Sequence, residues 1–104
     1  MGVQTSVNRI KFTQMVNLLC DFMRLHGYQP ALDWVKREPG CPHYKKGTYH
    51  EFGLAVDIHL YKDGHYFSGT QDHALFGQFW EFIGGTWGGA WDDGNHYSYL
   101  EGRQ

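Results

Sequence analysis

The stretch LAVDIHLY, residues 54–61, alternates apolar and polar side chains and limits the possible folds more than any other part of the sequence. Successive side chains of a β-strand point to opposite faces, so one face of this segment is apolar and the other carries Asp57. Asp63 and Gly64 follow, a dipeptide typical of a two-residue hairpin turn. The pattern predicts a half-buried strand over residues 54–61 and a return strand that begins at Tyr66.

Two segments have the periodicity of amphipathic helices. Apolar residues recur at three- and four-residue steps over residues 8–26 and again over residues 71–83. Gly27 is placed to end the first helix, and Gly84 with Gly85 to end the second. The candidate N-terminal capping residues are Ser6 or Asn8 for the first helix and Ser68 or Thr70 for the second.

Further short strands complete a small sheet. Residues 31–37 lie between Pro30 and Pro39, which is typical of an edge strand, and residues 96–100 form a last strand after a loop rich in glycine and tryptophan. We therefore expect one α+β domain over residues 1–104, with an antiparallel sheet and helices packed on one face.

Composition excludes several classes of protein. The chain has 104 residues, of which 41% are hydrophobic, so we expect one domain with a modest core. The net charge of −2 does not indicate the excess of positive charge that is typical of proteins that bind nucleic acid. No apolar run is long enough to span a bilayer and no signal peptide is evident, so we expect no membrane insertion. We also expect a monomer that is made in a reducing cytoplasm, with Cys20 in the core and Cys41 in a loop.

Asp57 is the least expected residue of its strand, because a buried carboxylate is costly unless it is paired or bound to metal. His50 lies just upstream, and His96 begins the last strand. Two imidazoles and one carboxylate form a plausible three-ligand zinc set that leaves a fourth position for water. Spacing alone leaves open the alternative that Asp57 is an ordinary surface carboxylate on a half-exposed strand.

Two motifs at either end of the domain make a family resemblance specific. Residues 48–57, TYHEFGLAVD, resemble the Ser-x-His-x-x-Gly-x-Ala-x-Asp signature of the zinc D-Ala-D-Ala carboxypeptidase and L-Ala-D-Glu endopeptidase family. Asp93, three residues before His96, resembles the family's second signature, an acidic residue three before a histidine. The family includes VanX- and VanY-type enzymes and many phage endolysins, and its fold is shared with the Hedgehog signalling domain. The resemblance is strongest from about Tyr49 to Tyr99.

The resemblance assigns roles to individual residues. It implies His50, Asp57 and His96 as ligands of a Zn²⁺ ion and Asp93 as the catalytic acid/base. Arg37 fits the place of the family's arginine on an early strand, where it would stabilise negative charge on the tetrahedral intermediate or bind a substrate carboxylate.

Three further residues are candidates for substrate contact. Thr48 stands where the family has serine and keeps the hydroxyl group. His59 lies two residues beyond Asp57 on the same strand face, although an exposed strand residue is the alternative. Trp91 is a candidate to line the cleft or stack on sugars, but it and Trp87 can equally pack beneath the glycine-rich loop.

The function implied is that of a zinc metallopeptidase acting on peptidoglycan stem peptides, most simply a bacteriophage endolysin for host lysis with L-Ala-D-Glu endopeptidase activity. It would be made in the host cytoplasm and act on the cell wall. Three alternatives stay open: a D-Ala-D-Ala carboxypeptidase, a non-catalytic zinc-containing cell-wall or peptide-binding module, and a virion component.

Overall fold

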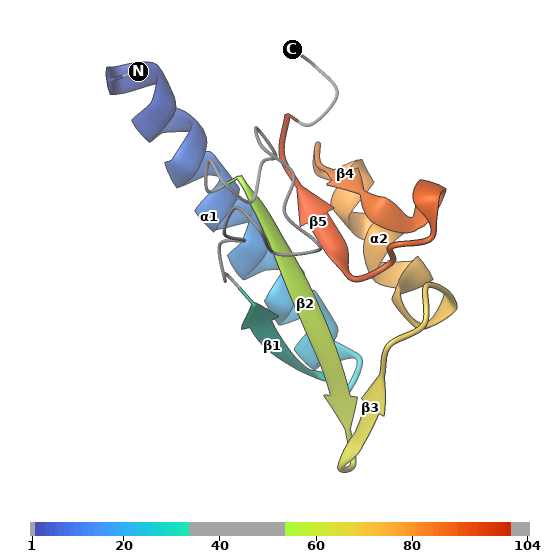
Figure 1. The fold of residues 1–104 in the computed structure, drawn as a ribbon. Helices are drawn as coiled ribbons and strands as arrows, with labels where there is room; N and C mark the ends of the chain where they lie inside the picture. Colours follow the sequence, from blue (N-terminus) through green and yellow to red (C-terminus); the bar gives the residue numbers. More distant parts are fainter. Residues whose placement is uncertain (1, 34–53, 101–104) are drawn as a thin grey trace, which may run out of the picture.

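The alternating stretch forms β2, an eight-residue strand at the centre of the sheet in the computed structural model, which describes residues 2–33 and 54–100. Every pairing in the sheet is antiparallel, and the strand order is β1-β2-β5-β4, with β3 paired to the far end of β2 (Figure 1). The strands are β1 (Gln29–Asp33), β2 (Ala55–Lys62), β3 (His65–Phe67), β4 (Thr86–Trp87) and β5 (His96–Ser98).

The predicted alternation of β2 is confirmed. Val56, Ile58 and Leu60 are fully buried and belong to the hydrophobic core, whereas Asp57 and His59 point to the other face and are partly exposed. The strand therefore presents one apolar and one polar face, as its sequence requires.

The predicted hairpin is also confirmed. Asp63 and Gly64 both have positive φ, 52° and 78°, and they connect the paired residues Lys62 and His65. Positive φ at both central residues defines the type I′ turn, whose twist matches that of the strands that it joins.

The first helix, α1 (Gly2–Leu25), begins earlier than predicted. Ser6 and Asn8 lie inside it, so their assignment as capping residues is wrong. Residues 3–26 contain neither glycine nor proline, and adding residues to an existing helix costs far less than starting one. The helix therefore continues upstream of its first core-facing residue.

The end of α1 is as predicted. Gly27 has φ of 88°, and its N–H donates to the Arg24 carbonyl at 2.9 Å. The N–H of Tyr28 donates to the Met23 carbonyl at 3.0 Å. These two bonds form a Schellman motif, which satisfies carbonyl groups that the helix itself leaves without partners.

The second predicted helix consists of a 3₁₀ turn, η1 (Gln71–His73), followed by α2 (Ala74–Phe82). Gly84 and Gly85 end it, donating to the carbonyls of Glu81 and Trp80. The capping role predicted for Thr70 is wrong, because its side chain makes no capping hydrogen bond.

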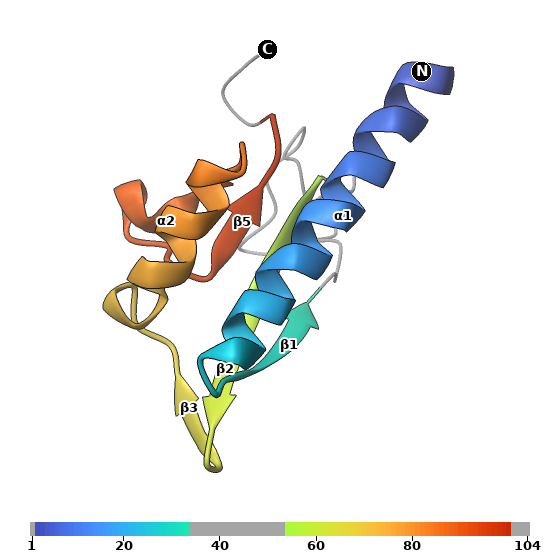
Figure 2. The same ribbon diagram turned by 180° about the vertical axis from the view of Figure 1, so that it is seen from behind.

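Both helices cover the same face of the sheet, which Figure 1 shows from the strand side and Figure 2 from the helix side. The core forms where they meet the apolar face of β2, and the indole N–H of Trp80 donates to the Ser98 carbonyl of β5 at 2.8 Å. Cys20 is buried in this core, as predicted. The core residues are Phe12, Met15, Val16, Leu19, Cys20, Met23, Val56, Ile58, Leu60, Phe76, Trp80 and Tyr97.

Several strand boundaries differ from the sequence prediction by one or two residues. β2 spans Ala55–Lys62 rather than residues 54–61, and β3 begins at His65 rather than Tyr66. β1 begins at Gln29 rather than residue 31, and the predicted positions beyond residue 33 lie outside the described residues. β5 ends at Ser98, and the sequence did not indicate β4, which is only two residues long. The α+β class, the antiparallel sheet and the two helices are confirmed. Among the described residues, no helix is both long and apolar enough to cross a membrane.

Candidate functional site

Asp57 and His96 come from distant parts of the sequence and lie directly opposite each other in the β2–β5 pairing. Nδ1 of His96 is 3.8 Å from Oδ1 of Asp57. Only 9% of the His96 side chain and 13% of the Asp57 side chain are exposed. The pair lies on the face of β2 opposite the helices, so the sheet places a nearly buried carboxylate beside an imidazole on that face.

The spacing of these two atoms suits a shared metal ion. Bond lengths of 2.0 to 2.2 Å in a tetrahedral zinc site place two donor atoms about 3.4 Å apart, which is close to the observed separation. Within residues 2–33 and 54–100, no group of three histidine, cysteine, aspartate or glutamate side chains is arranged to hold a metal ion. A third ligand would have to come from elsewhere, and His50 lies outside the described residues.

The loop before β5 holds Asp93 through its main chain. The Asp93 N–H donates to the Gly88 carbonyl at 2.9 Å, and its own carbonyl accepts from the His96 N–H at 3.1 Å. The second bond closes a β-turn with Asp93 at its first position, so the turn expected at residues 93 and 94 is present. The Asp93 side chain belongs to an exposed residue.

Gly88 fixes how closely this loop packs. A Cβ at that position would lie 2.2 Å from the Asp93 carbonyl oxygen and 2.9 Å from the His96 Cβ. Both contacts are too short for any residue with a side chain. The close approach of η2 (Gly88–Trp91) to Asp93 and His96 therefore requires glycine.

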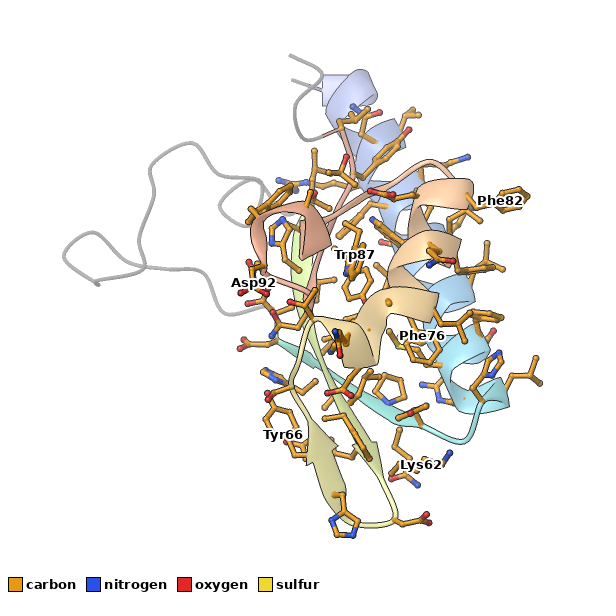
Figure 3. The ribbon with its side chains drawn as sticks, turned by 90° about the vertical axis from the view of Figure 1, so that its right-hand side faces the viewer. Lys62, Tyr66, Phe76, Phe82, Trp87 and Asp92 are labelled. Carbon is orange, nitrogen blue, oxygen red and sulfur yellow. The ribbon has the colours of Figure 1, made fainter. Side chains whose placement is uncertain are left out.

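Thr70 supports the same loop from another segment. Its hydroxyl donates to Oδ1 of Asp92 at 2.9 Å and accepts from the Gly94 N–H at 3.2 Å. Asp92 has a positive φ of 59°. Figure 3 places Asp92 on the side of the sheet away from Phe76 and Phe82 of α2. The sequence did not reveal this role of Thr70.

The two tryptophans of the glycine-rich loop differ in environment. The indole N–H of Trp87 donates to the Gly94 carbonyl at 2.7 Å, and the ring packs so closely on Gly77 that a Cβ there would lie 2.0 Å from it. Trp87 is thus a packing residue between the loop and α2 (Figure 3). Trp91 is half exposed, and its ring centroid is 5.8 Å from that of His96. The structure brings Trp91, but not Trp87, beside the Asp57–His96 pair.

His59 belongs to a second cluster on the face of the sheet opposite the helices. Its Nε2 is 3.5 Å from Oδ2 of Asp33 in β1, and its Nδ1 is hydrogen-bonded to the Tyr66 hydroxyl in β3 at 2.9 Å. The His59 and Asp33 side chains are 30% and 39% exposed. Through these contacts His59 joins three strands, β1, β2 and β3.

Another histidine is buried on the helix side of the sheet, and the sequence analysis did not predict its burial. His73 is fully buried, and its Nδ1 is hydrogen-bonded to the Tyr97 hydroxyl at 2.7 Å. Its Nε2 makes no hydrogen bond of good geometry to the described residues. Burial lowers the pKa of His73 from 6.5 to about 4, against the opposing effects of the Asp72 charge and the Phe67 carbonyl. Burial also raises the pKa of Tyr97, so this pair is neutral near pH 7.

Of the predicted site residues, the structure brings together Asp57, His96 and Trp91, with the Asp93 turn adjoining them. His59 lies two residues along β2. Thr48, Arg37 and His50 lie outside the described residues. A carboxylate and an imidazole on the sheet face opposite the helices, with an exposed carboxylate one turn away, are suited to metal binding and proton transfer. No protein-family model, curated protein or solved structure matches this chain.

Proposed function

We propose that this chain is a zinc-dependent peptidase that hydrolyses an amide bond in the stem peptides of peptidoglycan. The observation that carries the proposal is the position of Asp57 opposite His96, at 3.8 Å and nearly buried. These are two of the three ligands implied by the family signatures, and the sheet register pairs them although they belong to separate motifs. If Asp57 were an ordinary surface carboxylate, we would not expect the sheet register to place it opposite the imidazole of the other motif.

The proposed metal ligands are His50, Asp57 and His96. A carboxylate with two imidazoles is a donor set typical of catalytic zinc sites, which keep a further coordination position for water or substrate. When bound, zinc supplies Lewis-acid activation of water and of the scissile carbonyl group. The side chains of this chain must then position the substrate and transfer protons.

Asp93 is the proposed general acid/base, accepting a proton from the attacking water and returning it to the leaving amine. Its exposure and its place one β-turn before His96 support this role. Arg37 is proposed to stabilise negative charge that develops on the substrate or to bind a substrate carboxylate. Trp91, half exposed beside His96, offers an apolar contact surface to the substrate, and Thr48 and His59 are further candidates for substrate contact.

The proposal includes the setting implied by the resemblance. The fold would be of the Hedgehog/DD-peptidase type, and the activity that of a phage endolysin that cleaves the L-Ala-D-Glu bond. The enzyme would be made in the host cytoplasm and act on the wall as a monomer. A D-Ala-D-Ala carboxypeptidase uses the same kinds of residue, so only the identity of the products separates the two activities.

The test is digestion of purified peptidoglycan with mass spectrometry of the released fragments. The zinc-loaded protein should release stem-peptide fragments, a chelator should abolish their release, and added zinc should restore it. New amino-terminal D-Glu residues would identify the endopeptidase, and release of single D-Ala residues the carboxypeptidase.

The same experiment separates an enzyme from a binding module. Intact muropeptides after incubation with protein of full zinc occupancy would contradict the peptidase. Binding of such protein to the wall without cleavage would favour the non-catalytic module. Detection of the chain in purified phage particles would indicate a virion component.

A further inference from the structure

The segment that carries Asp93 is held from both sides by one side chain of a distant segment. Thr70, between β3 and η1, donates its hydroxyl hydrogen to Oδ1 of Asp92 and accepts the N–H of Gly94. A hydroxyl group has one donor and two acceptor positions, so both bonds can form at once. The two residues that flank Asp93 are therefore tied to the same oxygen atom.

The main chain around Asp93 leaves little room for adjustment. A Cβ at Gly94 would lie 2.5 Å from the Cα of Thr70 and 3.0 Å from its hydroxyl oxygen. The Gly94 carbonyl accepts from the Trp87 indole at 2.7 Å. Gly94 is thus fixed through its N–H by Thr70 and through its carbonyl by Trp87.

Thr70 stands at a helix-capping position, yet its hydroxyl makes no capping bond there. Thr70 is partly buried, and both of its hydroxyl bonds are to the loop before β5. The hydrogen-bonding capacity of this side chain therefore serves the loop rather than the start of η1.

We propose that Thr70 is a positioning residue for Asp93. By holding residues 92 and 94, it fixes the direction in which the Asp93 carboxylate leaves the main chain. The inference rests on the proposed function as far as the acid/base role of Asp93 is concerned. Misplacing a reacting group by about 1 Å can reduce the rate by about 100-fold, so removal of the hydroxyl should lower turnover rather than metal or substrate binding.

The experiment compares Thr70→Val, which is similar in shape but lacks the hydroxyl, with Thr70→Ser, which retains it. Thr13→Val is the matched control, because Thr13 on α1 donates a similar bond of 2.9 Å to the Arg9 carbonyl, at an exposed position outside the site. Each zinc-loaded variant is assayed for kcat and KM on peptidoglycan, for zinc affinity, and for hydrogen exchange at the Gly94 amide by NMR.

Thr70→Val should lower kcat by about 10- to 100-fold and leave KM and zinc affinity within about twofold. It should speed exchange of the Gly94 amide by about two- to tenfold, which is the effect expected from the loss of one hydrogen bond. Thr70→Ser should restore most of kcat and of the Gly94 protection, and Thr13→Val should match the wild type. If Thr70→Val acted only by destabilising the whole fold, its KM would not stay unchanged and Thr70→Ser would not restore kcat. If Thr70→Val does not fold, Asp92→Ala, which removes one of the two bonds at an exposed residue, should lower kcat by a smaller factor.

Three outcomes would overturn the inference, and they can be distinguished from one another. Wild-type kcat in Thr70→Val, in a protein that Asp93→Ala inactivates, would refute the positioning role and leave the proposed function intact. No hydrolysis by the wild type at full zinc occupancy would refute the proposed function and with it the positioning role. Unchanged exchange of the Gly94 amide in Thr70→Val would show that the Thr70 hydroxyl does not hold residue 94, whatever the activity of the variant.

Discussion

Among the residues that the structure describes, the sheet face opposite the helices carries two histidine–aspartate pairs that differ in burial and in partners. His96 and Asp57 pair across β2 and β5, and their side chains are 9% and 13% exposed. His59 and Asp33 pair across β1 and β2 at 3.5 Å, but are 30% and 39% exposed, and His59 is also bonded to Tyr66. Figure 3 places Tyr66 on the hairpin, well away from Asp92 and the loop before β5.

The difference shows that burial, more than the type of residue, separates a candidate metal site from a surface ion pair. An exposed pair contributes about 0 to 1 kcal/mol and needs no further explanation. A nearly buried carboxylate needs compensation by hydrogen bonds, an opposite charge or a metal ion. Asp57 is such a carboxylate. Its partner His96 lies against the loop that requires glycine at position 88, and the ring of Trp91 lies near that of His96.

The largest difference between the two pairs should be in zinc affinity, when the histidine of each pair is replaced in turn by alanine. His96→Ala should weaken zinc binding by at least about 100-fold, because even loss of a group that only supports a ligand costs 10- to 100-fold. His59→Ala should bind zinc as the wild type does. Isothermal titration of the metal-free proteins measures both affinities. An equal loss in His59→Ala would make His59 a ligand and reverse our ranking of the pairs.

Asp93→Ala should separate metal binding from proton transfer at the buried pair. We expect wild-type zinc affinity but a 10²- to 10⁴-fold lower kcat on peptidoglycan, the usual contribution of a general acid/base. Asp21→Ala is the matched control, since it removes an exposed carboxylate paired with Arg24 on α1. If Asp93→Ala lost the metal instead, Asp93 would be a ligand rather than the acid/base.

The sequence predicted the elements in which local rules and tertiary packing agree. The alternation of β2, the type I′ turn at Asp63 and Gly64, and the glycine ends of both helices each follow from a few adjacent residues. These predictions needed no knowledge of how distant segments pack. The sequence analysis also grouped Asp57 with His96, as candidate ligands of one metal ion, but it did not predict that they pair across β2 and β5.

What the sequence did not reveal depends on contacts between distant segments. Thr70 has the residue type of a helix cap, and only the approach of Gly94 redirects its hydroxyl. His73 lies at the start of a helix, where exposure is usual, but packing against Tyr97 buries it completely. β4 is held by β5 and is too short to leave a pattern. Periodicity cannot report such contacts, since each depends on a partner far along the chain.

His73 is a third histidine environment, and it should dominate the acid sensitivity of the fold. Its folded pKa of about 4 is below the ordinary 6.5, so between these values the unfolded chain binds a proton that the folded chain does not. Above pH 6.5, His73 is neutral in both states and does not reduce the free energy of unfolding. As the pH falls from 6.5 toward 4, proton binding by the unfolded chain lowers the free energy of unfolding by about 3 kcal/mol.

Urea unfolding of the metal-free wild type and of His73→Gln, each at pH 7 and pH 4.5, tests this expectation. The free energy of unfolding of the wild type should fall more on acidification than that of the variant. His59→Ala is the control, because it also removes a histidine, but one that is partly exposed and lies outside the hydrophobic core. The same acid sensitivity in His73→Gln and the wild type would show that carboxylates rather than His73 set it.

The smallest effect should be that of the exposed pair on stability. In a double-mutant cycle with His59→Ala and Asp33→Asn, the coupling free energy should not exceed about 1 kcal/mol, because both side chains remain hydrated and salt screens their attraction. Urea unfolding of the wild type, the two single variants and the double variant, all at the same pH, measures it. A coupling above about 2 kcal/mol would be outside the range of surface pairs. It would mean that the three-strand junction of Asp33, His59 and Tyr66 shields its charges more than their exposure indicates, and burial would then no longer separate the two pairs.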